Sequence, residues 1–192
     1  MVTKVKFIVV VFAALFLAAA KSGETQVAVQ KTAADLFKTL KPGQWVELEG
    51  TVQKDYTVLT KKVKLLTGDF QDDDWEIKAA VRTIDKAKKQ FQVLLLPVVT
   101  SQETEYENDA GTFKSFDQLK VGMLVECEGT YLKDGTFAAE EVQEETDYEP
   151  NELHELRAVG KVEKIDPEKR TVKMVGVTFK IIESTKVQSA LK

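Results

Sequence analysis

Hydrophobic and polar residues alternate along much of this chain. In the segment GMLVECEGTYL, the apolar residues Val125 and Cys127 alternate with Glu126 and Glu128. An earlier segment, GQWVELEGTVQ, has the same alternation. A period of two predicts β-strands that turn one face to a core and the other to solvent.

Turn residues separate the predicted strands. A Lys-Asp-Gly turn ending at Gly135 predicts a hairpin with TFAAEEVQEE as its return strand. The segment GKVEKIDPEKRTVKMVGVTFKII predicts three strands, with turns at Asp-Pro-Glu-Lys-Arg and at Val-Gly176. Helical spacing is confined to SFDQLK and KTAADLFKTL, where Leu36, Phe37 and Leu40 share a face.

Much of the pattern occurs twice. Residues 37–63 recur at 116–142 with an offset of 79, and 13 of the 27 aligned residues are identical. The similarity resumes downstream at an offset of 81, where VRTIDKAKKQFQV aligns with VEKIDPEKRTVKM. A repeat of this length predicts a duplicated small domain rather than a solenoid unit.

The predicted order of elements suggests a fold. From Trp75 to Glu144 the order is three strands, a short helix and two strands, which is the order of an OB-fold, a five-stranded partly open barrel. We therefore expect a mainly β protein with two small OB-like five-stranded barrels from an internal duplication, together with short helices and an N-terminal signal helix.

The repeat allows two divisions into domains. In the first, a linker at 21–34 precedes one repeat at 35–110 and another at 111–192. In the second, a central barrel at 75–145 is accompanied by a barrel made of 31–66 plus 156–185.

The N-terminus has a different pattern. Lys4 and Lys6 precede the apolar run 7–20, and a polar segment follows, which predicts a signal peptide at 1–20. An uncleaved anchor is the alternative, but 14 apolar residues make about 21 Å of helix, short of a ~30 Å hydrocarbon core. We expect export to a periplasmic or extracellular location, with no membrane attachment after cleavage.

The charge argues against one class of partner, and the cysteine content argues against a disulfide. The net charge of −4 argues against nucleic acid as a partner, because phosphates attract basic surfaces. The single cysteine, Cys127, cannot form an internal disulfide, and its place on an apolar face predicts a buried structural residue.

Two segments resemble a known family. FDQLKVGMLVECEGTYLKDGTFAAEEV and VGKVEKIDPEKRTVKMVGVTFKIIESTKV resemble the exported bacterial OB-like repeats of domain-of-unknown-function family 5666, and more distantly periplasmic bacterial OB-fold proteins. The shared features are L-K-x-G-x-x-V-x-x-x-G, the D-G hairpin and G-x-V-x-x-I-D. The resemblance implies an OB-like fold and export, and it carries over no catalytic residue. Its structural positions are Gly50, Gly129, Gly135 and Gly160.

Catalytic and metal-binding patterns are sparse. The sole histidine, His154, has no nucleophile elbow or H-E-x-x-H motif beside it, so we expect no enzyme and no catalytic residue. The acidic run at Asp72, Asp73 and Asp74 could bind calcium, although the EF-hand spacing is missing.

Aromatic residues are the other candidates for ligand binding. Trp45, Trp75, Tyr106 and Tyr148 could stack on an oligosaccharide, as aromatic side chains do on OB-folds. Trp45 is out of phase with the apolar positions of its strand and is expected to face outward. The alternative is that these rings cap a barrel or fill the interface between two barrels.

Together these patterns predict an exported, non-enzymatic binding or interaction module whose ligand is an envelope protein or an oligosaccharide. A calcium-dependent structural or adhesion protein of the cell envelope is one alternative. A hydrolase that uses a pair of carboxylates is another.

Overall fold

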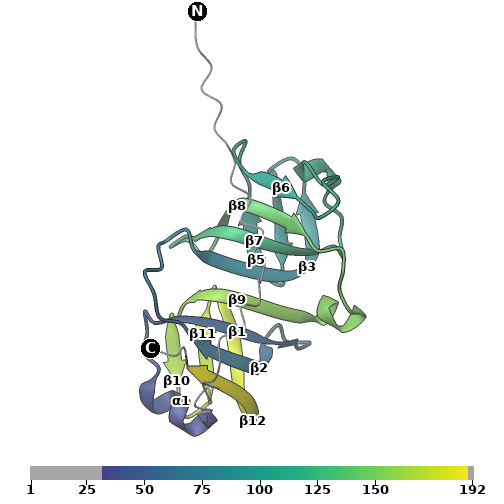
Figure 1. Ribbon diagram of the computed structural model, residues 1–192. Helices are drawn as coiled ribbons and strands as arrows, with labels where there is room; N and C mark the ends of the chain where they lie inside the picture. Colours follow the sequence, from purple (N-terminus) through teal and green to yellow (C-terminus); the bar gives the residue numbers. More distant parts are fainter. Residues whose placement is uncertain (1–31, 190–192) are drawn as a thin grey trace, which may run out of the picture.

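The computed structural model describes residues 32–189 (Figure 1). The predicted signal peptide at 1–20 lies outside the described residues. The elements in chain order are α1 (Ala33–Thr39), β1 (Trp45–Val52), β2 (Val58–Leu65), β3 (Trp75–Asp85), β4 (Gln90–Val93), β5 (Leu96–Val99), β6 (Glu105–Glu107), the 3-10 helix η1 (Phe116–Gln118), β7 (Leu124–Tyr131), β8 (Phe137–Glu144), the 3-10 helix η2 (Pro150–His154), β9 (Glu155–Lys161), β10 (Lys164–Asp166), β11 (Thr171–Met174) and β12 (Val177–Ser189).

Five strands from the middle of the chain close into a barrel. β3 pairs with β4, β4 with β5, β5 with β8, β8 with β7, and β7 again with β3. The β5–β8 pair is parallel and the other pairs are antiparallel. The short strand β6 lies beside β8 at the rim. The prediction of a mainly β protein with a five-stranded barrel is confirmed for this part.

The remaining strands come from the two ends of the described chain. They pair in the order β10-β11-β12-β2-β1-β9, and β12 runs parallel to β2. β1 and β2 therefore pair with strands of 155–189, and β3 and β5 pair with strands of 124–144. The strands of 35–110 do not form a barrel among themselves, because the free edge of β2 is occupied by β12.

One antiparallel pair, β3 with β9, joins the two groups of strands. Ile77 lies opposite Ala158, and these residues are 81 positions apart. Lys78 lies opposite Arg157. Because β9 also pairs with β1, the outer faces of the two groups form one continuous sheet surface. Figure 1 shows β8, β7, β3, β9, β1 and β2 lying one below another.

The same local geometry occurs in both groups. β1 and β7 each have a bulge, at Glu49/Gly50 and at Glu128/Gly129. A Cβ on Gly50 would lie 2.2 Å from the Leu59 carbonyl oxygen. On Gly129 it would lie 2.1 Å from that of Ala138. Glycine is therefore needed at both bulges, as their predicted structural role requires.

A pair of threonines repeats this correspondence. The Thr104 hydroxyl donates to the Ala139 carbonyl and the Thr185 hydroxyl to the Thr60 carbonyl, both at 2.8 Å. In the hairpin turns Gly135 has a φ of 87°, and the residue at the equivalent place, Tyr56, has a φ of 60°. The first turn thus forms without the glycine that the pattern leads one to expect.

The interior is apolar, with 35 buried hydrophobic residues in one cluster. Cys127 is fully buried within it, as predicted, and burial raises the pKa of its thiol. α1 is capped by Thr32, whose hydroxyl oxygen accepts from the Asp35 N–H, and it buries Leu36. Among residues 32–189, no helix is long and apolar enough to cross a membrane.

Candidate functional site

Four glutamates lie directly opposite one another on the outer face of the central barrel. Because Val125 and Cys127 of β7 point to the core, Glu128 points outward. It is paired with Glu76 of β3 on one side and with Glu141 of β8 on the other. Glu141 in turn lies opposite Glu105 of β6. We call these four residues the glutamate row.

The row concentrates negative charge. Neighbouring strands are about 4.8 Å apart, and like charges directly opposite one another destabilise a sheet. Burial, with the nearby Glu107 and Glu128 carboxylates, raises the pKa of Glu141 to about 7. Burial also raises the pKa of Glu128 and of Glu76. Burial is the main cause of these shifts, and the neighbouring carboxylates add to it.

One cation reaches the end of the row. Arg157 of β9 donates from its Nη2 to Glu76 and from its Nη1 to Glu126, both at 2.7 Å. Within the part of the chain that the structure describes, Glu105, Glu128 and Glu141 make no ion pair.

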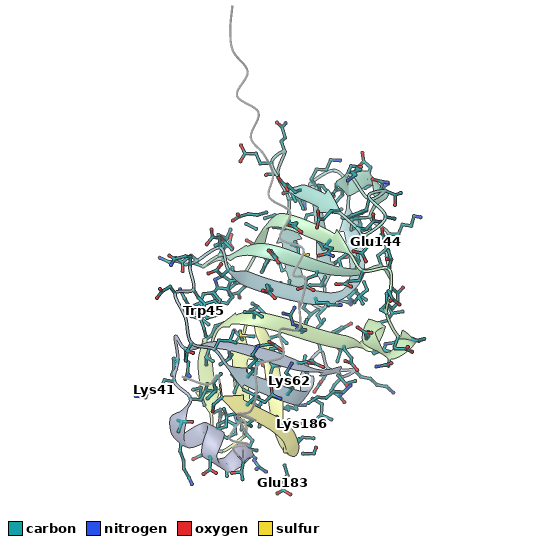
Figure 2. The ribbon with its side chains drawn as sticks, in the orientation of Figure 1. Lys41, Trp45, Lys62, Glu144, Glu183 and Lys186 are labelled. Carbon is teal, nitrogen blue, oxygen red and sulfur yellow. The ribbon has the colours of Figure 1, made fainter. Side chains whose placement is uncertain are left out.

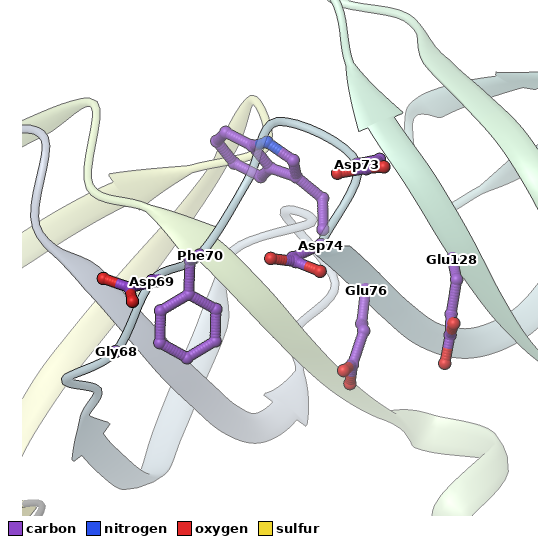
Figure 3. Close-up of a pocket in the computed structure, with 8 residues that line it drawn as sticks. Gly68, Asp69, Phe70, Asp73, Asp74, Glu76 and Glu128 are labelled. Atoms are coloured by element: carbon purple, nitrogen blue, oxygen red, sulfur yellow. The ribbon is translucent and has the colours of Figure 1, made fainter. Parts of the chain in front are cut away.

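Two adjoining hollows follow the row and share Asp73, Asp74 and Glu128. The first, of about 260 Å³, is also lined by Phe70 and Trp75. Figure 3 shows Asp73 and Asp74 between Phe70 and Glu128 in this view. The second hollow, of about 670 Å³, continues along β8. We call the two hollows the acidic groove. The other residues lining it are Gly68, Asp69, Glu76, Ser101, Glu103, Thr104, Glu105, Gly129, Ala139, Glu140 and Glu141.

An aromatic cluster closes one end of the groove. The Trp45 ring lies 5.0 Å from that of Phe70 and 5.3 Å from that of Trp75, and Trp75 lies 5.5 Å from Tyr131. Trp75 is only 6% exposed and packs over Gly160, where a Cβ would lie 2.2 Å from the ring.

The four aromatic residues predicted to bind a ligand lie in different surroundings. Trp45 does not stand free on the outer face but is half-buried against Phe70 and Trp75. Trp75 fills the contact between β3 and β9 and is too buried to stack on a sugar. Tyr106 lies in β6 in edge contact with Phe113, and Tyr148 lies between β8 and η2. The described structure therefore does not bring the four predicted rings together.

The predicted calcium ligands do not converge. Asp72 pairs with Lys161 at 2.6 Å, and a carboxylate oxygen of Asp74 accepts from the Gln71 N–H. Among residues 32–189, no group of three or more His, Cys, Asp or Glu side chains is placed to hold a metal ion. Calcium binding stays a prediction without a site in this geometry.

The equivalent face of the other group of strands carries mostly basic residues. The residues that lie opposite one another there are Arg157, Glu49, Lys62 and Lys186. Figure 2 shows Lys62 and Lys186 in the lower group of strands. The Lys62 Nζ lies 2.6 Å from Glu47 and 3.4 Å from Glu49. The Lys62 ammonium accordingly lowers the pKa of Glu47, although burial opposes the shift.

Sequence reasoning missed the glutamate row. The sequence shows only that glutamates occupy outward positions of several predicted strands. Whether they lie opposite one another depends on the register in which the strands pair.

Comparison with known families bears on the central barrel. Residues 78–143 match a family described as "Domain of unknown function (DUF5666)". The match covers 66 of the 192 residues and shows a similarity to this family over that segment. The match begins within β3 and ends within β8, so it spans the strands of the closed barrel and contains Glu128 and Glu141. No curated protein and no solved structure matches the chain.

Proposed function

We propose that this protein is an exported, non-enzymatic binding module that acts through the acidic groove. The observation that carries this proposal is the glutamate row. Glu105, Glu128 and Glu141 make no ion pair among the described residues, whereas the equivalent positions of the other strands carry two lysines and one glutamate: Lys186, Glu49 and Lys62. Pairs of opposite charge across neighbouring strands would stabilise either face, so folding alone does not call for a row of like charges. An arrangement that costs stability on an outer surface is typical of a functional site.

We further infer that the two groups of strands are OB-like barrels related by duplication and nested in the chain. The closed order β3-β4-β5-β8-β7 with its one parallel pair supports this inference. The glutamate row lies on β3, β7, β8 and β6, away from the second and third strands on which OB-folds bind oligonucleotides. The proposed function therefore rests on the groove and takes nothing from the fold.

The double variant Glu128→Gln/Glu141→Gln tests the premise. Removing two like charges is expected to raise the Tm by roughly 2–4 °C, which corresponds to about 1 kcal/mol for a chain of this size. Differential scanning calorimetry measures the shift. A lower Tm in the variant would show that the row stabilises the fold, and the proposal would then lose its basis.

One observation favours a second candidate, a carboxylate-based hydrolase. Glu141, with a pKa of about 7, could donate a proton, and the Glu128 carboxylate lies directly opposite it. Glu128 is exposed on an open sheet surface, where water is not excluded. Turnover of aryl glycosides that Glu141→Gln abolishes would support the hydrolase, and no turnover over a broad panel would remove it.

A further inference from the structure

The geometry points to a basic polypeptide segment, rich in arginine and lysine, as the partner that docks in the acidic groove. This inference rests on the proposed function and names the chemistry of the partner.

The dimensions of the face favour several linked cations over a single ion. Four strands at about 4.8 Å spacing spread the glutamate row over roughly 14 Å. A second line of acidic residues, Glu126 and Glu107, lies two positions further along β7 and β6, about 7 Å away. Alternate side chains of an extended segment are also about 7 Å apart. Lysines and arginines of one segment can therefore meet several of these carboxylates at once.

The aromatic end of the groove suits arginine in particular. The half-buried Phe70 ring lines the same hollow as Asp69, Asp73 and Asp74. A guanidinium group stacks on aromatic rings and also donates to carboxylates. A compact metal ion would instead need converging oxygens, and the described residues hold no such group.

The charge balance of the two groups of strands agrees with this partner. Residues 75–145 contain 14 Asp and Glu against 8 Lys and Arg, a formal charge of −6. Residues 32–66 and 155–189 together contain 9 against 14, a formal charge of +5. A cationic partner is thus steered to the central barrel.

A second copy of the chain is the less suitable occupant. It could offer the basic strands, where Lys186 makes no ion pair among the described residues, but Lys62 and Lys64 are already paired with Glu47 on their own chain. Docking there would first have to break those contacts, whereas a separate basic segment brings unpaired cations.

The test is fluorescence anisotropy with fluorescein-labelled octa-arginine, and an alternating Glu-Lys peptide of equal length serves as the control probe. The protein is expected to bind octa-arginine at 50 mM NaCl and much more weakly at 300 mM, because salt screens the contacts. Glu128→Gln/Glu141→Gln should weaken binding about tenfold, the equivalent of 1.4 kcal/mol. The matched control, Glu168→Gln/Glu183→Gln, removes the same charge from exposed positions in the β10–β11 turn and in β12 and should change affinity less than about twofold.

Each other outcome is decisive. Equal weakening by both double variants would show attraction by overall charge and would overturn the groove as the site. No binding of octa-arginine, with a Tm that still rises in Glu128→Gln/Glu141→Gln, would overturn the partner chemistry and leave the proposed function standing. No binding and no rise in Tm would overturn both. Sedimentation velocity that shows a dimer lost in the same variant would identify a second copy as the occupant and would overturn the basic segment.

Discussion

The two outer faces of the molecule use one backbone plan and opposite charges. At four equivalent positions the central barrel carries Glu105, Glu141, Glu128 and Glu76, and the other strands carry Lys186, Lys62, Glu49 and Arg157. Bulges, turns and threonine hydrogen bonds agree between the two groups. The shared interior and turns thus determine the backbone conformation of both groups, and this conformation is compatible with different charges on the outer face. The fold therefore does not by itself require the acidic residues of this face.

Substitutions at the two bulges should have the largest effect on stability, and the effect should be similar in the two groups of strands. Gly129→Ala places a Cβ 2.1 Å from the Ala138 carbonyl oxygen, and Gly50→Ala places one 2.2 Å from that of Leu59. Each substitution is expected to lower the free energy of unfolding by on the order of 3 kcal/mol, measured by urea denaturation. If one group tolerates alanine and the other does not, the structural equivalence of the two bulges is wrong.

Exchanging one charge between the faces should have the next largest effect. Glu141→Lys gives the central barrel the residue found at the equivalent place, Lys62, and sets a cation between Glu105 and Glu128. We expect an increase of about 1–2 kcal/mol in stability, since two like-charge pairs become opposite-charge pairs. Lys62→Glu should lower stability by a similar amount. Chemical denaturation of both variants measures the two changes in the free energy of unfolding. If both variants were stabilised, or both destabilised, the contrast between the two faces would be wrong.

The pH dependence of stability should also separate the faces. The pKa of Glu141 is raised from 4.5 to about 7 in the folded protein. Its folded form therefore binds a proton more tightly than its unfolded form. The contribution of this proton to stability is fully present below pH 4.5 and is lost as the pH rises through 7. We expect a higher Tm at pH 5.5 than at pH 8.

The variant Glu141→Gln provides the control, because it should flatten the pH profile between 4.5 and 7. A profile that rises from pH 5.5 to 8 in the original protein would contradict the raised pKa.

The smallest predicted effect concerns the aromatic end of the groove. Phe70→Leu keeps an apolar side chain but removes the ring beside Asp69 and Asp73. Octa-arginine should lose about 0.5–1 kcal/mol of binding free energy, a two- to fivefold change, and octa-lysine should lose less. Anisotropy titrations of both peptides measure the difference. Equal losses for the two peptides would show that the ring does not select arginine.

Local patterns predicted the strands well. Alternation placed Val125 and Cys127 in the core, and the Asp-Gly turn gave the hairpin at Gly135. The turn at Tyr56 and the one at Leu94 were harder to predict, because both residues adopt a positive φ without being glycine. The well-packed hairpins around them hold these conformations.

The site was less accessible to sequence reasoning than the strands. Glu105 and Glu141 are neighbours only because β6 runs parallel to β8, and no local pattern encodes such a pair. Trp45 was predicted to face outward, but its covering by Phe70 comes from the course of the connection between β2 and β3. The sequence also left open which strands pair with which, because the repeat fits two divisions of the chain into domains.

The nesting of the strands has a consequence for the order of folding. Val46 pairs with Gly160, so the strands synthesised first must wait for those synthesised last. The central barrel needs no residue beyond Glu144 to close, so it can form before the rest of the chain is free to fold. Until β9 and β12 emerge, β1 and β2 expose unpaired edges that invite aggregation. The completed central barrel presents the edge of β3 on which β9 then pairs.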